Sequence, residues 1–218
     1  MKILILQGPV GGYFTHLANH LRRAGFDVRR LVFNGGDIAF SLFSEYTVAR
    51  LSGVRYTKYF SDYFKEWRPD AVILFGDQRL IHRAASIIAR RQGIPVWSFE
   101  EGYVRPDHVT FERSGNNALS SVARSFDPTA PVREVAPAPR LKGQTFAMIR
   151  AAFVYFITYR VTRSLFPGYR HHRERRLRDE FFFWWRTLGR RGAAVRGDAA
   201  LVEELIEGKR SPFFLVAL

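Results

Sequence analysis

Short apolar runs alternate with segments of helical periodicity along the first hundred residues. Runs rich in aliphatic and β-branched residues, as buried strands are, occur at 1–7, 27–33, 71–75 and 95–99. Apolar residues recur at helical spacing in 13–24, 56–67 and 79–92. The segment 38–53 has no clear period. Strands that alternate with helices predict an α/β fold built on a parallel, Rossmann-like sheet.

Polar residues gather where two of these strands are predicted to end. Glu100, Glu101 and Gly102 follow the run 95–99, and Asp77 and Arg79 follow the run 71–75. The carboxyl ends of parallel strands open into the ligand crevice of an α/β sheet, so such residues converge there. We therefore expect a functional site at this edge.

The other two strands are followed by glycine-rich turns. The turn 8–12 precedes a helix, where backbone N–H groups can approach an anion. Its spacing matches neither the dinucleotide fingerprint nor a P-loop, so a tight turn of small residues is the alternative. The residues 34–37 are interpreted as a loop that requires the dihedral angles of glycine.

Composition limits what the chain can contain. With 218 residues, 47% of them hydrophobic and 15% aromatic, it can bury one α/β core and an appendage, but not two full Rossmann-like halves. It has no cysteine, which excludes disulfides and thiolate metal sites and fits a reducing compartment. No metal site is predicted. The apolar segments 1–7 and 151–159 are too short for a signal peptide or a membrane span.

Positive charge is concentrated in the second half of the chain. Residues 140–191 contain 13 Arg and Lys against 3 acids, interleaved with large aromatic residues. This combination on helices suits docking on an anionic membrane surface. Two alternatives stay open: the aromatic residues pack against a further part of the protein, or the segment binds nucleic acid, which no recognisable motif supports.

These changes in composition along the chain define the predicted domains. They are a Rossmann-like domain at 1–126, a proline-rich linker at 127–143, a basic helical segment at 144–210 and the start of a second Rossmann-like domain at 211–218. We accordingly expect the chain to end where a second half begins.

Several motifs occur in a characteristic order. They are LQGPVG at 6–11, FNGGD at 33–37, FGDQR at 75–79, HRAA at 82–85, FEEGYVRP at 99–106 and TFER at 110–113. In this order they resemble the capsule polysaccharide biosynthesis and export proteins of the KpsS type. The resemblance covers about the first 115 residues and is only general beyond Gly115.

The resemblance implies a fold and an activity. It implies the N-terminal half of a GT-B-like, retaining β-Kdo glycosyltransferase, peripheral on the cytoplasmic face of the membrane. The donor would be CMP-Kdo, with no further cofactor, and the acceptor would be linked to lipid. Other capsule assembly proteins would be further partners, and nucleic acid would not. The nucleotide site would lie in the C-terminal half, outside this chain. The alternative is a non-catalytic component of capsule export or assembly.

The resemblance also implies roles for the two adjacent carboxylates. Glu101 would be the nucleophile of a double displacement that retains the anomeric configuration. Neighbours in an extended segment point to opposite faces, so Glu100 would take a separate, structural role or be the nucleophile in its place. The alternative is that both glutamates pair with Arg79 and Arg105.

Further residues would surround the substrates. His82 would act as a base or hold a phosphate, unless it is only a solvated or capping residue. Arg105 and Arg79 would hold anions, because a guanidinium can grip a carboxylate in a bidentate manner. His108 is an acid/base candidate or an ordinary loop histidine. The remaining predicted substrate contacts are Gln7, Gly8, Gly11, Asn34, Asp37, Asp77, Gly102 and Tyr103.

Overall fold

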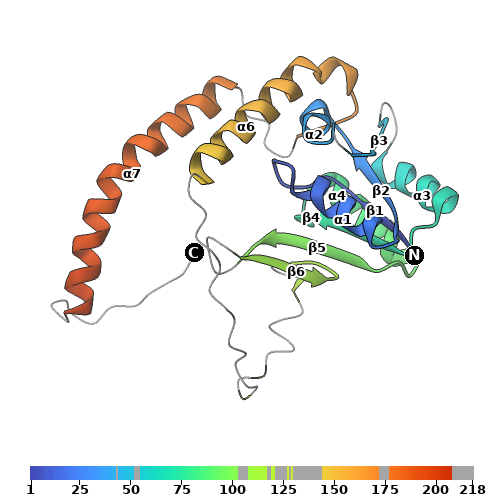
Figure 1. The fold of residues 1–218 in the computed structure, drawn as a ribbon, viewed down its shortest axis with the longest axis horizontal. Coiled ribbons are helices and arrows are strands. Elements are labelled where there is room, and N and C mark those ends of the chain that lie inside the picture. The colour runs from blue at the N-terminus through green and yellow to red at the C-terminus, as the bar shows by residue number, and fades with distance from the viewer. Residues whose placement is uncertain are drawn as a thin grey trace. The chain divides into compact units, whose positions relative to one another are not determined.

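The computed structural model describes most of the chain and divides it into two compact units. The units are Met1–His172 and Arg173–Leu218 (Figure 1). The described residues are 1–42, 44–51, 55–102, 108–116, 119–120, 127, 129, 144–171 and 177–207. The predicted linker, except Asp127 and Thr129, and the strand expected near the end therefore lie outside the described residues.

The first unit contains a six-stranded sheet. Its strands are β1 (Lys2–Ile5), β2 (Asp27–Val32), β3 (Thr47–Val48), β4 (Ala71–Phe75), β5 (Val96–Glu101) and β6 (Val109–Arg113). Their order in the sheet is β3-β2-β1-β4-β5-β6. Neighbours from β3 to β5 pair in parallel, and β6 is antiparallel to β5. This topology confirms the predicted α/β fold with a Rossmann-like sheet.

Helices cover both faces of the sheet. Those of the first unit are α1 (Tyr13–Arg23), α2 (Gly35–Ala39), α3 (Tyr56–Trp67), α4 (Leu80–Arg91) and α6 (Gln144–Val161), followed by the 3-10 turn η2 (Arg163–Leu165). Ile3 and Ile5 of β1 pack with Phe14 of α1, whereas Leu4 and Leu6 belong to the larger core on the other face. Both faces are buried, which is why the strands are nearly continuous apolar runs.

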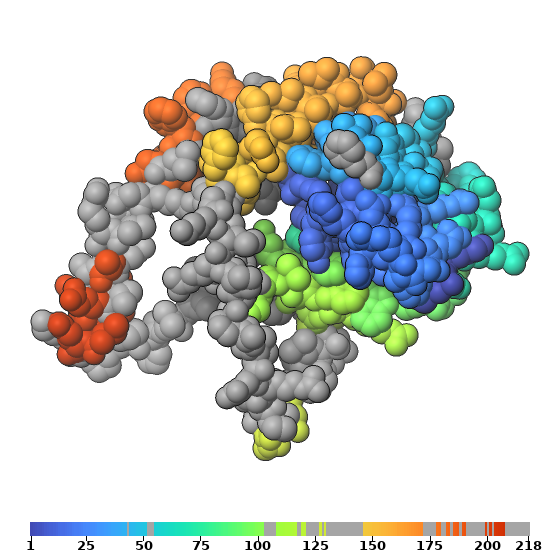
Figure 2. Space-filling model, in the orientation of Figure 1, coloured from blue at the N-terminus to red at the C-terminus, as the bar shows by residue number. Residues whose placement is uncertain are grey.

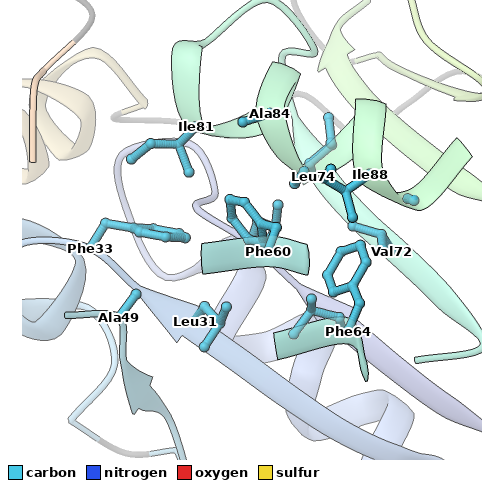
Figure 3. Packing of buried hydrophobic residues seen from close by; sticks show 14 of the residues in the cluster. Leu31, Phe33, Ala49, Phe60, Phe64, Val72, Leu74, Ile81, Ala84 and Ile88 are labelled. Atoms are coloured by element: carbon cyan, nitrogen blue, oxygen red, sulfur yellow. The ribbon is translucent and has the colours of Figure 1, made fainter. Parts of the chain in front are cut away.

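The larger core lies between the sheet and two helices. Phe60 and Phe64 of α3 lie against Val72 and Leu74 of β4, and Ile81 of α4 belongs to the same cluster (Figure 3). Phe60 and Phe64 are one turn apart, and both are almost completely buried. This packing sets the position of the loop between β4 and α4.

The structure differs from the sequence prediction in three short elements. The strand β3 lies in the segment without a clear period, and the apolar pattern does not predict β6. Both are at an edge of the sheet. Both residues of β3 are exposed and β6 is mostly exposed, so neither produces an apolar run. The prediction of a loop at 34–37 is wrong. Asn34 instead caps α2, with its side-chain oxygen accepting a hydrogen bond from the Asp37 N–H at 3.0 Å.

Residues 144–171 belong to the first unit, and α6 packs alongside α2 (Figure 1). Tyr155 is 5% exposed and Tyr169 is 8% exposed. Tyr159 and Phe166 pack against the larger core. The sequence predicts that Tyr155, Tyr159 and Phe166 meet a membrane surface or a further part of the protein. They contact the Rossmann-like unit itself, because one face of α6 is apolar and buried there.

The second unit contains one long helix, α7 (Leu177–Ile206). Its 30 residues correspond to about 45 Å of helix. The short helix predicted at 199–207 is the end of α7. Phe182, Phe183 and Trp185 on this helix are exposed. Among the described residues, no helix is long and apolar enough to cross a membrane.

Candidate functional site

The order of the strands reverses between β1 and β4, and Arg79 bridges the two at this point. The chain leaves β1 toward α1 on one face and leaves β4 toward α4 on the other. In open α/β sheets, ligands bind at the carboxyl ends of the strands at such a reversal. Arg79 lies just before α4, and its Nη1 donates to Gln7 Oε1 and to the Gly8 carbonyl, both at 3.2 Å. Burial lowers the pKa of Arg79, while nearby tyrosines, Asp37 and Glu100 oppose the shift.

Five buried polar side chains form one hydrogen-bonded group beside Arg79, which we call the Gln7 cluster. Gln7 Nε2 lies 2.8 Å from Asp37 Oδ1, 3.0 Å from the Tyr169 hydroxyl and 3.2 Å from the Tyr155 hydroxyl. Asn34 Nδ2 lies 3.1 Å from the Tyr155 hydroxyl. The cluster therefore links the loop after β1, the start of α2 and the segment 144–171. Its members are Gln7, Asn34, Asp37, Tyr155 and Tyr169.

The carboxylate of Asp37 is the acidic centre of this cluster. Its Oδ2 also accepts from the Phe33 N–H at 2.9 Å and from Asn34 Nδ2 at 3.2 Å. Burial raises the pKa of Asp37, and the hydrogen bonds from Gln7 and Phe33 act in the opposite direction. Burial also raises the pKa of the Tyr155 and Tyr169 hydroxyls, so both stay protonated and able to donate.

The raised pKa of Asp37 gives a test of its environment. In acid, below the usual carboxyl pKa of about 4, the side chain is protonated in both the folded and the unfolded protein. As the pH rises, the unfolded chain ionises first, so the wild type should lose stability relative to Asp37→Asn until the raised folded-state pKa is passed. Each unit by which the folded-state pKa is raised contributes about 1.4 kcal/mol to this loss. Urea unfolding of both proteins between pH 3 and 8 measures it; a constant difference would contradict it.

Two glycines allow α6 to approach α2 closely. A Cβ atom on Gly36 would lie 2.6 Å from ring carbons of Tyr155, and one on Gly35 would lie 2.8 Å from Thr162 Cβ. Neither glycine has a positive φ. The sequence predicts that these glycines are needed for their dihedral freedom, but the structure requires them because a side chain would collide with Tyr155 of α6 or with Thr162 just after it.

Asn34 and Asp37 were predicted to contact substrate. Here Asn34 contacts the Tyr155 hydroxyl, and Asp37 accepts hydrogen bonds from Gln7, Asn34 and the Phe33 N–H. Tyr155 is 121 residues from Asn34, and Tyr169 is 162 residues from Gln7. In the sequence, Tyr155 is one of many aromatic residues of the basic segment, and nothing distinguishes Tyr169. No local pattern connects residues so far apart, so only the folded chain reveals this cluster.

The two adjacent glutamates are the last residues of β5, where side chains alternate between the faces of the sheet. Glu100 is half-buried on the side of Gly76 and Arg79, and its Oε2 lies 3.3 Å from the position of a Cβ on Gly76. Glu101 is exposed at the strand end. Arg105 and Tyr103, predicted to hold substrate with them, lie outside the described residues.

The two candidate histidines occupy different environments. His82 lies in the first turn of α4 with no exposed surface, and its Nδ1 is 2.8 Å from the Gly76 carbonyl. Because a carbonyl only accepts, Nδ1 carries the proton and fixes the turn after β4. Reaction with a substrate would require this ring to become exposed. His108 is exposed, and its carbonyl accepts from the Gly102 N–H at 2.9 Å.

The remaining candidates hold the loops in place. A Cβ on Gly102 would lie 2.5 Å from the His108 carbonyl oxygen, so this position needs glycine to bring β5 and β6 together. Asp77 is buried, and its Oδ2 accepts from the Asn116 N–H at 3.2 Å. Gly11 has a φ of +117°, which favours glycine in the turn before α1. Within the described ranges, no group of three or more His, Asp and Glu side chains is placed to hold a metal.

Comparison with known proteins assigns the chain to a family. Residues 70–218 match the family of capsule polysaccharide biosynthesis proteins. The capsule polysaccharide export protein KpsS of Escherichia coli is 34% identical over 177 residues, 79% of this chain and 45% of KpsS. The capsule polysaccharide modification protein LipB of Neisseria meningitidis serogroup A is 32% identical over a 226-residue alignment, 100% of this chain and 54% of LipB.

The chain thus spans about half the length of the curated relatives it matches. Among solved structures, UDP-GlcNAc 2-epimerase from Neisseria meningitidis bound to UDP-GlcNAc aligns with 48% of this chain and 33% of its own. The TM-score is 0.37 at 20% sequence identity. The family match and the two relatives agree with the motifs, and the chain belongs to the capsule polysaccharide biosynthesis protein family.

Proposed function

We propose that this chain is the acceptor-side half of a retaining β-Kdo glycosyltransferase, which uses CMP-Kdo and a lipid-linked acceptor in capsule synthesis. The observation that carries the proposal is the pair of carboxylates at the end of β5, of which Glu100 lies on the side of Arg79 and Glu101 is exposed. Membership of the capsule polysaccharide biosynthesis family supports a role in capsule synthesis. The names of KpsS and LipB refer to polysaccharide export and modification.

The proposed reaction has two displacements. A Glu101 oxygen attacks the anomeric carbon of Kdo, and the bond from this carbon to the phosphate oxygen breaks, so that CMP leaves with the electron pair. An acceptor hydroxyl then attacks the same carbon, loses its proton to a base, and displaces the carboxylate. Two inversions retain the configuration.

The residues around the carboxylates supply position and charge. Glu101 is exposed and therefore accessible to a sugar, while Glu100 lies on the side of the Arg79 guanidinium. Arg79 is held by Gln7 and the Gly8 carbonyl, so its charge stays at the carboxyl end of the sheet. We assign Arg79 to the anionic groups of the substrates, because Kdo carries a carboxylate and its donor carries a phosphate. Arg105 would assist it.

Intact-protein mass spectrometry tests this proposal. The full-length protein that carries this chain is incubated with CMP-Kdo and no acceptor. We expect an added mass of one Kdo residue, absent in Glu101→Ala and lost when acceptor is supplied. An adduct that persists in Glu101→Ala but disappears in Glu100→Ala would assign the nucleophile to Glu100 instead. Transfer to the acceptor without either carboxylate would contradict double displacement.

The alternative function is a non-catalytic component of capsule export, which the name of KpsS favours. Complementation of a capsule-deficient strain separates the two functions. A scaffold variant with Glu101→Gln should restore the capsule, and a transferase with this change should not.

A further inference from the structure

The outer face of α6 carries an apolar stripe that one arginine, Arg150, interrupts. Phe146, Phe153, Val154, Ile157 and Val161 are exposed and follow one another at intervals of one, three, four or seven residues, so they lie on one side of the helix. Leu165 in η2 extends the stripe. Phe146 is 73% exposed, Phe153 65% and Val161 76%. Figure 2 shows α6 on the surface of the first unit, beside α2.

The opposite face of α6 is already occupied. Tyr155 and Thr162 lie against the glycines of α2, and Tyr155 joins the Gln7 cluster. The helix is therefore apolar on both sides, with one side packed in its own unit and the other in contact with solvent. A neighbouring row of exposed apolar side chains on a helix is typical of a surface that contacts a partner.

The charges around the stripe indicate what covers it. Residues 144–171 contain four arginines and no Asp or Glu. Arg150 lies within the stripe, while Arg160 and Arg163 follow near its C-terminal end, and all three are exposed. Two copies joined through this face would bring arginines together without an acid in the segment to pair with them. A bilayer with anionic lipids offers both an apolar layer and negative headgroups.

We propose that the outer face of α6 docks in the interface of an anionic lipid bilayer, with the helix axis parallel to the membrane. The apolar side chains would enter the acyl boundary, and the arginine stems would extend along it while their guanidinium groups stay at the headgroups. The inner face would then hold the Gln7 cluster within about one helix diameter, roughly 10 Å, of the lipid. This inference rests on the proposed function in one respect, since a lipid-linked acceptor would be presented at the same surface.

Co-sedimentation of the full-length protein with vesicles tests the docking surface. An α6 face covered by a further part of the protein would show no vesicle binding, which would overturn the proposal. The vesicles contain phosphatidylglycerol and phosphatidylcholine, or phosphatidylcholine alone. We expect Phe153→Ser with Val161→Ser to lower the partition coefficient at least tenfold, because two exposed apolar side chains no longer enter the bilayer. The matched control is Leu42→Ser with Leu80→Ser, two exposed leucines elsewhere in the same unit, which should bind like the wild type.

The arginines give a second, independent readout. Each of Arg150→Gln and Arg160→Gln should lower binding to phosphatidylglycerol vesicles about fivefold, with little effect on phosphatidylcholine alone. Arg83→Gln, an exposed arginine on α4, is the charge control.

Two further results would overturn the proposal. One is vesicle binding that Phe153→Ser with Val161→Ser leaves unchanged, which would place the lipid contact elsewhere, for example on α7. The other is a dimer in sedimentation equilibrium that these substitutions dissociate, without vesicle binding, which would assign the stripe to a second copy. Vesicle binding does not depend on the transfer of Kdo, so the two proposals can fail independently. A protein that docks through α6 but transfers no Kdo to the acceptor would refute only the proposed function.

Discussion

Glu101→Gln should abolish Kdo transfer, with a fall in rate of roughly 10³-fold or more. The amide keeps the size and shape of the side chain but cannot form the glycosyl ester, so the first displacement has no nucleophile. Glu101 is exposed at the end of β5, and its substitution should change the free energy of unfolding by less than about 0.5 kcal/mol. A loss of activity in a stably folded variant would therefore show an effect on the transfer reaction and not on folding.

Two glutamates serve as controls for this measurement. Glu66→Gln, at an exposed position of α3, should transfer Kdo at the wild-type rate within about twofold. Glu100→Gln should retain more activity than Glu101→Gln, because Glu100 is assigned to Arg79 rather than to the sugar. Transfer is measured with radiolabelled CMP-Kdo and a lipid-linked acceptor. If Glu100→Gln lost more activity than Glu101→Gln, Glu100 would be assigned as the nucleophile. Full activity in both variants would exclude a carboxylate nucleophile on β5.

Gly36→Ala should lower the free energy of unfolding of the first unit by about 3 kcal/mol, at the upper end of the cost of overpacking. The new Cβ would lie 2.6 Å from the ring of Tyr155, which is 5% exposed. The ring cannot swing away without losing the contacts of its hydroxyl with Gln7 and Asn34. We expect faster hydrogen exchange throughout α6 together with the lower stability.

A double-mutant cycle separates this collision from other effects of the added methyl group. In a Tyr155→Leu background the ring is absent, so Gly36→Ala should cost much less than in the wild type. Gly189→Ala is the matched control, because a Cβ on this exposed helical glycine of α7 would meet no heavy atom within 4 Å. Alanine is favoured over glycine inside a helix by up to about 1 kcal/mol, so Gly189→Ala should not destabilise α7. If Gly36→Ala lowered the free energy of unfolding equally in both backgrounds, the added methyl group would not collide with the Tyr155 ring.

The elements of the central sheet could be predicted because each is specified locally. The strands β1, β4 and β5 lie between layers of helices, so their sequences are short apolar runs. The helices α1, α3 and α4 each bury one face, which produces the observed helical spacing. The same pattern places polar residues after β4 and near the end of β5. It predicts that Glu100 and Glu101 follow the strand, whereas pairing with β6 carries β5 through both of them.

The surroundings of the candidate site were decided by contacts between distant parts of the chain. The hydrophobic pattern of α6 could predict neither which element the helix packs against nor which of its faces is buried, because the helix is apolar around most of its circumference. Only the folded chain brings Tyr155 and Tyr169 to Gln7, buries His82 beneath the turn after β4, and places Glu100 near Arg79. Periodicity therefore determined the sheet and where its polar edge lies. Tertiary packing decided which side chains meet at that edge, because their hydrogen bonds join residues more than a hundred positions apart.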